Sequence, residues 1–269
     1  MGMITRILAF IYRWKKHPLF VLFYSINFFR SQFKAGVTFY TDDEFMEQLG
    51  HGKSFIRLND GEFHLMNGGS LAYQPYYPGI EKSFREFVKQ YSKDSPYIIG
   101  LPKTCMNKTN EDLKKEGKLY VWLPAKTMFR LFFPKNVSYG DGHAFYMDGF
   151  FIKIMEPILI TKHMIVVTNK QSIENFKNNK AVPFKRVSFV ETPSADSYGS
   201  YQKIYDDTVK AIDLIKGKVA SKKDIALIFS VGPASKQLVY EFSKVGYSGY
   251  DIGKGFEALY TDESLESRI

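Results

Sequence analysis

Short apolar segments alternate with amphipathic segments along the chain, and this alternation limits the possible folds more than any other feature. Runs of apolar residues predict strands at 54–58, 97–100, 164–168, 187–190, 225–230 and 249–252. Helical spacing of apolar residues predicts helices at 41–49, 81–91, 201–215 and 235–245, the first with Thr41 and Glu44 as a capping box. Because strands that alternate with helices form parallel sheets covered on both faces, we expect an α/β fold with an open, mostly parallel sheet.

The length and composition limit the domain organisation and the class of partner. With 269 residues the chain is near the upper size for one domain, so we expect a single domain at 37–269 after an N-terminal extension at 1–36. A hydrophobic content of 45% and a charged content of 24% exclude a disordered chain. The net charge of +9 favours nucleotide phosphates, an acidic membrane or nucleic acid as partner. The single Cys105 fits a reducing compartment, so we expect a cytoplasmic protein.

Residues 1–36 carry basic side chains and no acidic one. Apolar residues at helical spacing from Ile4 to Trp14 predict an interfacial amphipathic helix that Pro18 ends. The apolar run at 19–29 is shorter than the roughly 20 residues that cross a bilayer, and the basic residues before it do not match a signal peptide. Peripheral contact with the inner face of the plasma membrane and packing against the domain or a second subunit both stay open. No nucleic-acid-binding module is recognisable, so nucleic acid is not expected as a partner.

Two carboxylates follow the first predicted strand directly, in Asp60-Gly61-Glu62. Carboxylate oxygens at such a position hold Mg²⁺ or Mn²⁺, which in turn neutralises a phosphate. We interpret Gly61 as the residue that lets the backbone turn tightly enough for both side chains to face one cavity. The alternative is an ordinary turn, because Asp-Gly is a common turn dipeptide.

Three further loops are expected near this motif, because ligands of open parallel sheets bind beyond the carboxyl ends of the strands. The loop Gly232-Pro233-Ala234-Ser235 opens a helix whose unpaired N–H groups and dipole attract phosphate. Asp251-Ile252-Gly253-Lys254 places an acid and a base after the last strand. Asp196, in the polar loop at 191–198, either contributes to the site or caps the following helix.

Several motifs, in order along the chain, resemble the GT-D-type glycosyltransferases. They are Arg57-Leu58-Asn59-Asp60-Gly61-Glu62-Phe63, Gln74 in the segment 71–74, and the segments 98–102, 227–234 and 249–253. The resemblance extends from about Phe39 to Tyr260 and implies a Rossmann-like fold. It also implies sugar transfer from a nucleotide-sugar donor, typically a UDP-sugar, with Mn²⁺ or Mg²⁺ held by Asp60 and Glu62. We expect donor or phosphate contacts from Arg57, Asn59, Gly61, Gln74, Gly232, Pro233, Ser235, Gly253 and Lys254.

The chain departs from the family pattern at three positions. Lys254 stands where the family commonly has histidine, which removes a possible ligand or proton carrier but could hold a phosphate. Asn169 lies where an acidic residue is often found after the central strand. Asn59 replaces the first glycine of Arg-X-Gly-Asp-Gly-Glu, and we expect the turn to survive because asparagine tolerates a positive φ.

Together, the residues and the resemblance predict a metal-dependent glycosyltransferase that acts on a glycan, a lipid-linked oligosaccharide or a glycoprotein. The metal ion, with Arg57 or Lys254, would stabilise the departing nucleoside diphosphate. Asp60, Asp196 and Asp251 are candidates for the general base that activates the acceptor hydroxyl. Two alternatives stay open: a metal-dependent phosphoesterase or nucleotide hydrolase that uses the same carboxylates, and a membrane-surface scaffold without activity.

Overall fold

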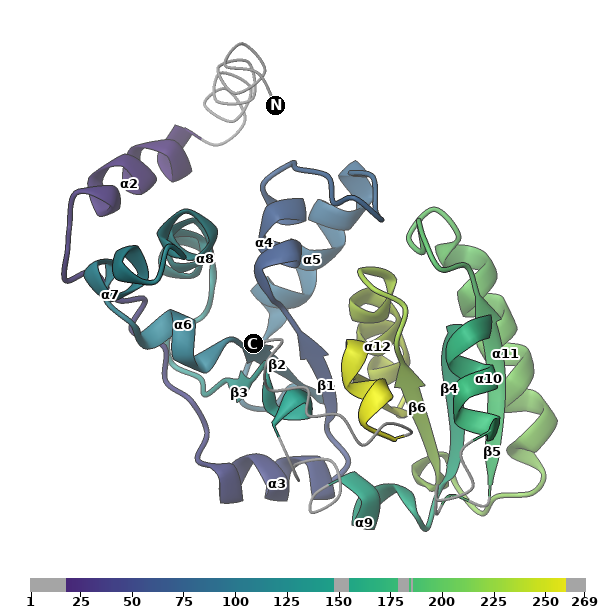
Figure 1. Cartoon of the computed structure of the whole chain (residues 1–269). Helices are drawn as coiled ribbons and strands as arrows, with labels where there is room; N and C mark the ends of the chain where they lie inside the picture. Colours follow the sequence, from purple (N-terminus) through teal and green to yellow (C-terminus); the bar gives the residue numbers. More distant parts are fainter. Residues whose placement is uncertain (1–17, 148–154, 179–183, 185, 260–269) are drawn as a thin grey trace.

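A computed structural model describes residues 18–147, 155–178, 184 and 186–259. Its sheet has seven strands in the order β3-β2-β1-β7-β6-β4-β5, and each neighbouring pair runs parallel (Figure 1). The strands are β1 (Ser54–Arg57), β2 (Tyr97–Leu101), β3 (Gly140–Asp141), β4 (His163–Asn169), β5 (Val187–Thr192), β6 (Ile225–Phe229) and β7 (Ser248–Asp251). The expected α/β fold with an open parallel sheet is confirmed.

Helices cover both faces of the sheet because alternate strand residues point to opposite sides. Ile56 and Ile99 belong to one apolar core, whereas their neighbours Phe55 and Ile98 belong to the other. The first core includes residues of α2 (Pro18–Phe28), α4 (Asp60–Met66), α5 (Pro78–Gln90), α7 (Asn110–Lys115), α8 (Leu119–Phe132), α11 (Tyr201–Lys216) and α12 (Ala234–Lys244). The second includes residues of α3 (Asp42–Gly50), the 3₁₀ helix η1 (Ala144–Tyr146), α9 (Glu156–Leu159), α10 (Lys170–Asn178) and the 3₁₀ helix η4 (Gly253–Leu259).

Local signals in the sequence explain several helix boundaries. Thr41 accepts a hydrogen bond from the backbone N–H of Glu44, which completes the predicted capping box at the start of α3. Pro18 is the first residue of α2, as suits a residue that lacks a backbone N–H. The predicted amphipathic helix before Pro18 lies outside the described residues. Within those residues, no helix combines the length and the apolarity needed to span a bilayer.

Candidate active site

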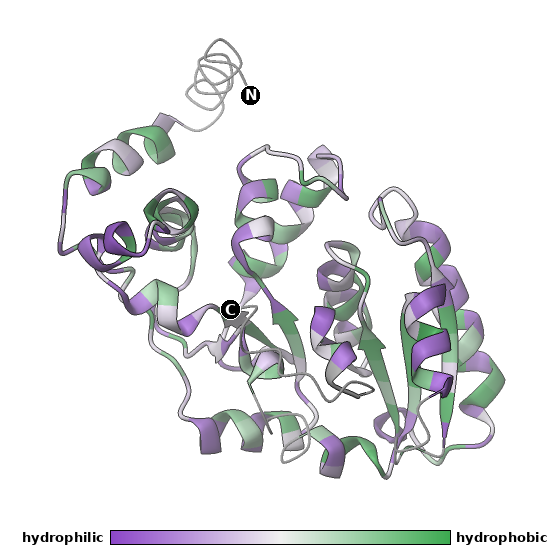
Figure 2. Ribbon diagram, in the orientation of Figure 1, coloured by the Kyte–Doolittle hydropathy of each residue, from purple (hydrophilic) through white to green (hydrophobic). Residues whose placement is uncertain are grey.

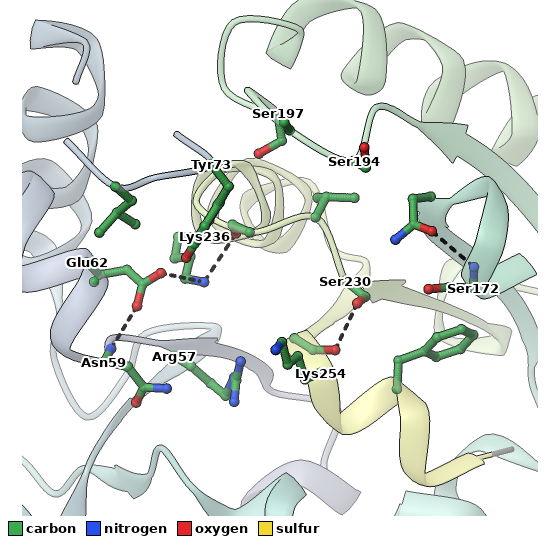
Figure 3. Close-up of a pocket in the computed structure, with 18 of the residues that line it drawn as sticks. Arg57, Asn59, Glu62, Tyr73, Ser172, Ser194, Ser197, Ser230, Lys236 and Lys254 are labelled. Atoms are coloured by element: carbon green, nitrogen blue, oxygen red, sulfur yellow. Dashed lines mark hydrogen bonds and ion pairs between the residues drawn. The ribbon is translucent and has the colours of Figure 1, made fainter. Parts of the chain in front are cut away.

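A cavity of about 490 Å³ opens at the carboxyl ends of β1, β6 and β4 (Figure 3). The loops that follow these strands and β5 and β7 supply most of its lining, including 59–62, 193–197, 230–232 and 253–254. This is the edge at which open parallel sheets bind their ligands. The strand-end loops singled out in the sequence therefore do meet in one pocket.

Asp60 and Glu62 both lie in the first turn of α4, and both line the pocket. Residues two positions apart on a helix are separated by about 200° around its axis. Asp60 is accordingly exposed and lines the pocket, whereas Glu62 is only 6% exposed. Both carboxylates therefore line one cavity, as the sequence predicts, although Glu62 is far more buried than Asp60.

Neither Gly61 nor Asn59 has the backbone role expected of it. Gly61 is helical, and a Cβ there would lie 3.2 Å from Cδ1 of Leu71, so the glycine allows close packing and does not make a tight turn. Asn59 has a φ of −105°, an extended conformation open to any residue. Its tolerance of positive φ is therefore irrelevant at this position. Both residues do line the pocket, as predicted.

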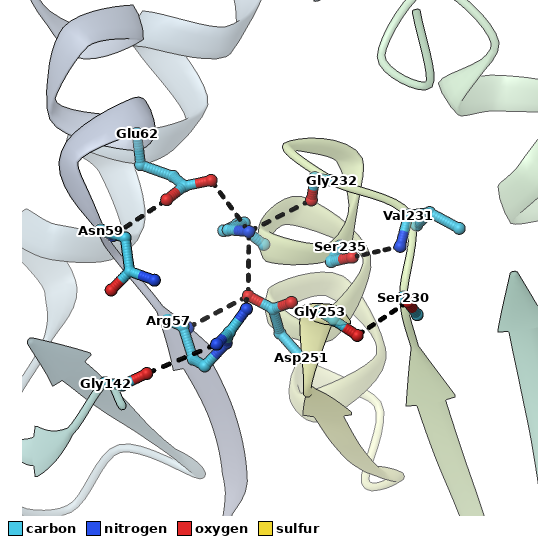
Figure 4. Close-up of polar contacts among 11 residues, drawn as sticks. Arg57, Asn59, Glu62, Gly142, Ser230, Val231, Gly232, Ser235, Asp251 and Gly253 are labelled. Atoms are coloured by element: carbon cyan, nitrogen blue, oxygen red, sulfur yellow. Dashed lines mark hydrogen bonds and ion pairs between the residues drawn. The ribbon is translucent and has the colours of Figure 1, made fainter. Parts of the chain in front are cut away.

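Lys236 of α12 joins three of the strand-end loops, through Glu62, Gly232 and Asp251, which are labelled in Figure 4. Its Nζ lies 3.0 Å from Oε1 of Glu62 and 3.1 Å from Oδ2 of Asp251, and it donates a hydrogen bond to the carbonyl oxygen of Gly232 at 3.2 Å. The other oxygen of Glu62 accepts a hydrogen bond from the backbone N–H of Asn59 at 2.9 Å. Burial lowers the pKa of Lys236, but Asp251 and Glu62 outweigh that effect and raise the pKa to about 12. The two carboxylates therefore favour the charged form of Lys236.

Arg57 completes this arrangement from the end of β1. Its backbone N–H donates to Oδ2 of Asp251 at 3.2 Å, and its guanidinium donates to the carbonyl oxygen of Gly142 at 3.4 Å. The guanidinium also lies over the ring of Tyr146, with 5.0 Å between Cζ and the ring centroid. We call the four residues Arg57, Glu62, Lys236 and Asp251 the charged cluster. Asp251 is fully buried and outside the pocket lining, so it anchors two cations instead of facing a substrate.

Gln74 and Asp196 connect two loops beside the pocket. The amide of Gln74 donates to Oδ1 of Asp196 at 2.9 Å and accepts from the backbone N–H of Tyr198 at 3.1 Å. The hydroxyl of Tyr77 donates to the second oxygen of Asp196 at 2.9 Å. Asp196 has a φ of 48°, and no other described residue except glycine has a positive φ. This strained backbone is held by the same hydrogen bonds.

These contacts correct the roles expected for Gln74 and Asp196. Gln74 is fully buried and does not line the pocket, so it shapes the wall instead of contacting a donor. Asp196 does line the pocket, but both of its carboxylate oxygens accept hydrogen bonds from protein groups. It is also not the cap of α11, whose N-cap residue is Ser200.

The two glycine loops contribute unequally. Gly232, Gly253 and Lys254 line the pocket, and Pro233 and Ser235 do not. Ser235 is fully buried, and its Oγ accepts a hydrogen bond from the backbone N–H of Val231 at 3.1 Å. The two residues therefore stabilise the start of α12 and do not face a donor, contrary to expectation. A Cβ on Gly253 would lie 2.0 Å from a guanidinium nitrogen of Arg57, so this glycine makes room for Arg57.

Sequence reasoning missed several residues of the site. Lys236 is the main one, and the pocket also includes Tyr73, Tyr146, Ser172 and Ser194. The one signal for Lys236 was its place in the first turn of a helix, where the helix dipole disfavours a cation. A cation at this end of a helix indicates a nearby carboxylate. The sequence alone does not identify it, because neither Glu62 nor Asp251 is adjacent to Lys236 along the chain.

The implied metal ion can be compared with the ligands that these residues offer. In the described part of the chain, no group of three or more His, Cys, Asp or Glu residues could hold a metal ion. Each oxygen of Glu62 already has a protein partner, Lys236 for one and the backbone N–H of Asn59 for the other, so an ion at Glu62 would compete with the charge of Lys236. Asp60 has no such partner among the described residues. Since Mg²⁺ is often held by one or two carboxylates together with substrate phosphates, Asp60 fits a shared site of this kind, and the metal stays a prediction.

Comparison with known proteins identifies the family. Residues 55–258 match the family model for the glycosyltransferase GT-D fold. The chain belongs to this family. The GT-D match extends from β1 into η4 and so includes the whole charged cluster. The resemblance to GT-D-type glycosyltransferases is thereby confirmed.

Individual relatives are distant. The chain is 23% identical over 215 residues to a probable glycosyl transferase, Gly, of Streptococcus gordonii, a match that covers 76% of this chain and 30% of that protein. A solved structure of domain of unknown function 1792 superposes with a TM-score of 0.66 at 19% identity, covering 81% of this chain and 79% of the other. Another structure of that domain, described as having a distinct glycosyltransferase fold, gives a TM-score of 0.64 at 21% identity over the same shares. A third, described as a new glycosyltransferase from Streptococcus sanguinis, gives 0.63 at 19% identity and covers 81% of each chain. These likenesses show a shared GT-D fold.

Proposed function

We propose that the chain transfers a sugar from a nucleotide-sugar donor, a UDP-sugar by family resemblance, to a glycan, a lipid-linked oligosaccharide or a glycoprotein. Membership of the GT-D family supports glycosyl transfer. The observation that carries the proposal is the pocket at the carboxyl edge of the sheet, where Arg57 and Lys254 face the same space as Asp60. A departing nucleoside diphosphate develops negative charge, and cations fixed around it lower the barrier to its departure.

Different side chains of the pocket would stabilise the charge of the departing diphosphate in different ways. Arg57 is held by Gly142 and Tyr146 and needs no reorganisation to present its charge. Lys254 is exposed in the lining and can follow the phosphates. A divalent ion shared between Asp60 and the donor phosphates would neutralise further charge when bound. Of the three aspartates considered as general base, Asp60 alone lines the pocket without a protein partner among the described residues.

Donor screening tests the proposal directly. The purified chain would be mixed with individual nucleotide sugars, with and without Mn²⁺, and its melting temperature measured, because a ligand that binds the native state raises that temperature. We expect one donor to stabilise the chain, and we expect Asp60→Asn to weaken this stabilisation and to abolish turnover. Asp94→Asn is the control, since Asp94 is exposed and lies outside the pocket lining.

The reaction products separate the alternatives. Sugar transfer to an added acceptor supports a glycosyltransferase. Release of nucleotide or phosphate from simple esters, without sugar transfer, would indicate the hydrolase instead. Failure of every nucleotide sugar to bind, with no effect of Asp60→Asn, would contradict both enzymatic functions and favour a scaffold.

We also propose a cytoplasmic location with peripheral contact between residues 1–36 and the inner face of the plasma membrane. The net charge of +9 and the absence of acidic residues from that segment support contact with an anionic surface. The structure describes residues 18–36 of the segment.

A further inference from the structure

α2 exposes a second apolar face after it has packed against α8. Phe20 and Val21 are buried in the core, and α2 lies at the periphery of the molecule beside α8 (Figure 1). The opposite side of the helix carries Leu19, Leu22, Phe23 and Ile26, which are 61%, 47%, 40% and 47% exposed. Their spacing of i, i+3, i+4 and i+7 places them in one stripe. Figure 2 shows α2 largely in the colours of hydrophobic residues.

Aromatic residues at the end of α2 extend this stripe. Phe29 is 85% exposed, and its ring centroid lies 5.3 Å from that of Phe28. Phe28 in turn lies 6.0 Å from the ring of Tyr120, a residue of α8 that is 73% exposed. We define the apolar face as Leu19, Leu22, Phe23, Ile26, Phe29 and Tyr120.

A buried polar network fixes α2 in this position. Lys126 of α8 is fully buried, and its Nζ donates to the carbonyl oxygens of Phe33 at 2.6 Å and Lys108 at 2.9 Å and to Oδ1 of Asn110 at 2.9 Å. The amide of Asn110 donates to the carbonyl oxygen of Asn27 at 2.7 Å. These bonds tie the end of α2 and the segment after it to α7 and α8. The apolar face therefore belongs to a helix whose other side is already packed and hydrogen-bonded within the protein.

The charges around the apolar face select one kind of partner. Arg30 and Lys34, just after α2, are exposed, and the exposed acidic residues Glu111 and Asp112 of α7 lie near Gln32 and Lys34. The sequence before Pro18 adds Arg6, Arg13, Lys15 and Lys16, and residues 1–36 contain no acid. A second copy of the chain would bring like charges together across the contact, which is unfavourable, whereas anionic lipid headgroups complement them.

We propose that the apolar face inserts into the interfacial region of an anionic membrane, with Arg30 and Lys34 at the headgroups. An α-helix of 11 residues is about 16 Å long, so α2 lies in the plane of the interface and does not cross the bilayer. No described residue that lines the pocket belongs to α2 or α8, so this contact leaves the pocket open. The apolar face lies outside the pocket, and its insertion rests on the membrane contact proposed above for residues 1–36 and not on the identity of the donor.

Vesicle co-sedimentation of the full chain tests the inference. We expect binding to phosphatidylcholine vesicles that contain phosphatidylglycerol, weaker binding as salt increases, and little binding to phosphatidylcholine alone. The triple variant Leu22→Ser, Phe23→Ser, Ile26→Ser should bind at least about tenfold more weakly. Leu214→Ser is the control, because Leu214 is 77% exposed on α11 and outside the apolar face.

Three results would overturn the inference. The first is failure of the parent chain to bind anionic vesicles, and the second is equal binding by the triple variant and the control. The third is a concentration-dependent dimer in analytical ultracentrifugation that the triple variant abolishes, since the apolar face would then bind a second copy. The urea denaturation midpoint of each variant shows whether it is folded. Donor binding in solution is a separate measurement, so none of these three results would contradict the proposed transferase activity.

Discussion

Replacing Glu62 by glutamine separates two roles that the Asp-X-Glu motif could give this residue. As a metal ligand, Glu62 would matter to ion binding and little to stability. As the partner of Lys236, it neutralises a cation that is only 3% exposed, with 3.0 Å between Nζ and Oε1. The structure favours the second role, because both oxygens of Glu62 are already bound.

The expected loss of stability follows from this burial. Breaking a buried ion pair by removing one partner costs about 3 to 5 kcal/mol. In Glu62→Gln the amide oxygen can still accept a hydrogen bond from Lys236, and Asp251 still neutralises the charge of Lys236. We therefore expect a smaller loss, a fall of about 1 to 3 kcal/mol in the free energy of unfolding. Asp60→Asn should change it by less than about 0.5 kcal/mol, because Asp60 is exposed.

A double-mutant cycle identifies the pair. Lys236→Met leaves Glu62 buried without its cation and leaves Asp251 with Arg57 alone, which should cost about 3 to 5 kcal/mol. Adding Glu62→Gln then removes the unpaired charge of Glu62. The double variant should therefore lose at least about 1 kcal/mol less stability than the two single variants lose in total. Urea unfolding followed by circular dichroism measures each corner, and Glu47→Gln on the exposed surface of α3 is the matched control.

The metal dependence of donor binding provides the second measurement. Asp60→Asn should raise the Mn²⁺ concentration needed for half-maximal donor binding by at least about tenfold, because it removes the open carboxylate ligand. Glu62→Gln should leave this concentration unchanged once the lower stability is taken into account. The reasoning fails if Glu62→Gln unfolds at the same urea concentration as Glu47→Gln and shifts the Mn²⁺ requirement as Asp60→Asn does.

Two further perturbations test the site wall and the support of α2. Gly253→Ala should lower the free energy of unfolding by about 1 to 2 kcal/mol and weaken donor binding, because Gly253 has a φ of 49° and the new Cβ would displace Arg57. The control Gly217→Ala, which has open space around it, should have neither effect in a thermal-shift measurement with donor. Burial lowers the pKa of Lys126 to about 8, so the folded chain releases this proton before the unfolded chain does. The free energy of unfolding of the parent chain relative to Lys126→Met should therefore rise between pH 8 and about pH 9.5, and parallel urea curves for the two proteins would contradict this.

Much of the fold was predictable because its signals are local. The apolar runs gave the positions of six strands within about two residues, and Thr41 with Glu44 gave the start of α3. The edge of the sheet that carries the pocket followed from a general rule for parallel sheets. The short strand β3 was missed because Gly140–Asp141 has no apolar run of its own.

The roles of individual site residues were harder to predict because they depend on contacts between distant segments. The sequence marked Asp60 and Glu62 as a pair, but the position of Lys236 in space determines that Glu62 is buried and bound. Gln74 was placed with the donor contacts, yet its amide is used up by the loop that carries Asp196. The local sequence pattern identifies neither partner, although the place of Lys236 in the first turn of α12 indicates that some carboxylate is nearby.

The charges of the pocket give an argument for a metal ion that does not depend on the Asp-X-Glu motif. The charged residues in the lining are the cations Arg57, Lys236 and Lys254 and the anions Asp60, Glu62, Asp196 and Glu257. Three positive and four negative charges give the lining a net charge of −1, and the buried Asp251 behind it adds another negative charge. A diphosphate brings further negative charge into this space, which Arg57 and Lys254 alone do not balance. A divalent cation that enters with the donor would supply the missing positive charge, and the exposed carboxylate of Asp60 is the lining group best placed to receive it. The replacement of histidine by Lys254 reduces this deficit without removing it, so donor binding should still strengthen when Mn²⁺ is added.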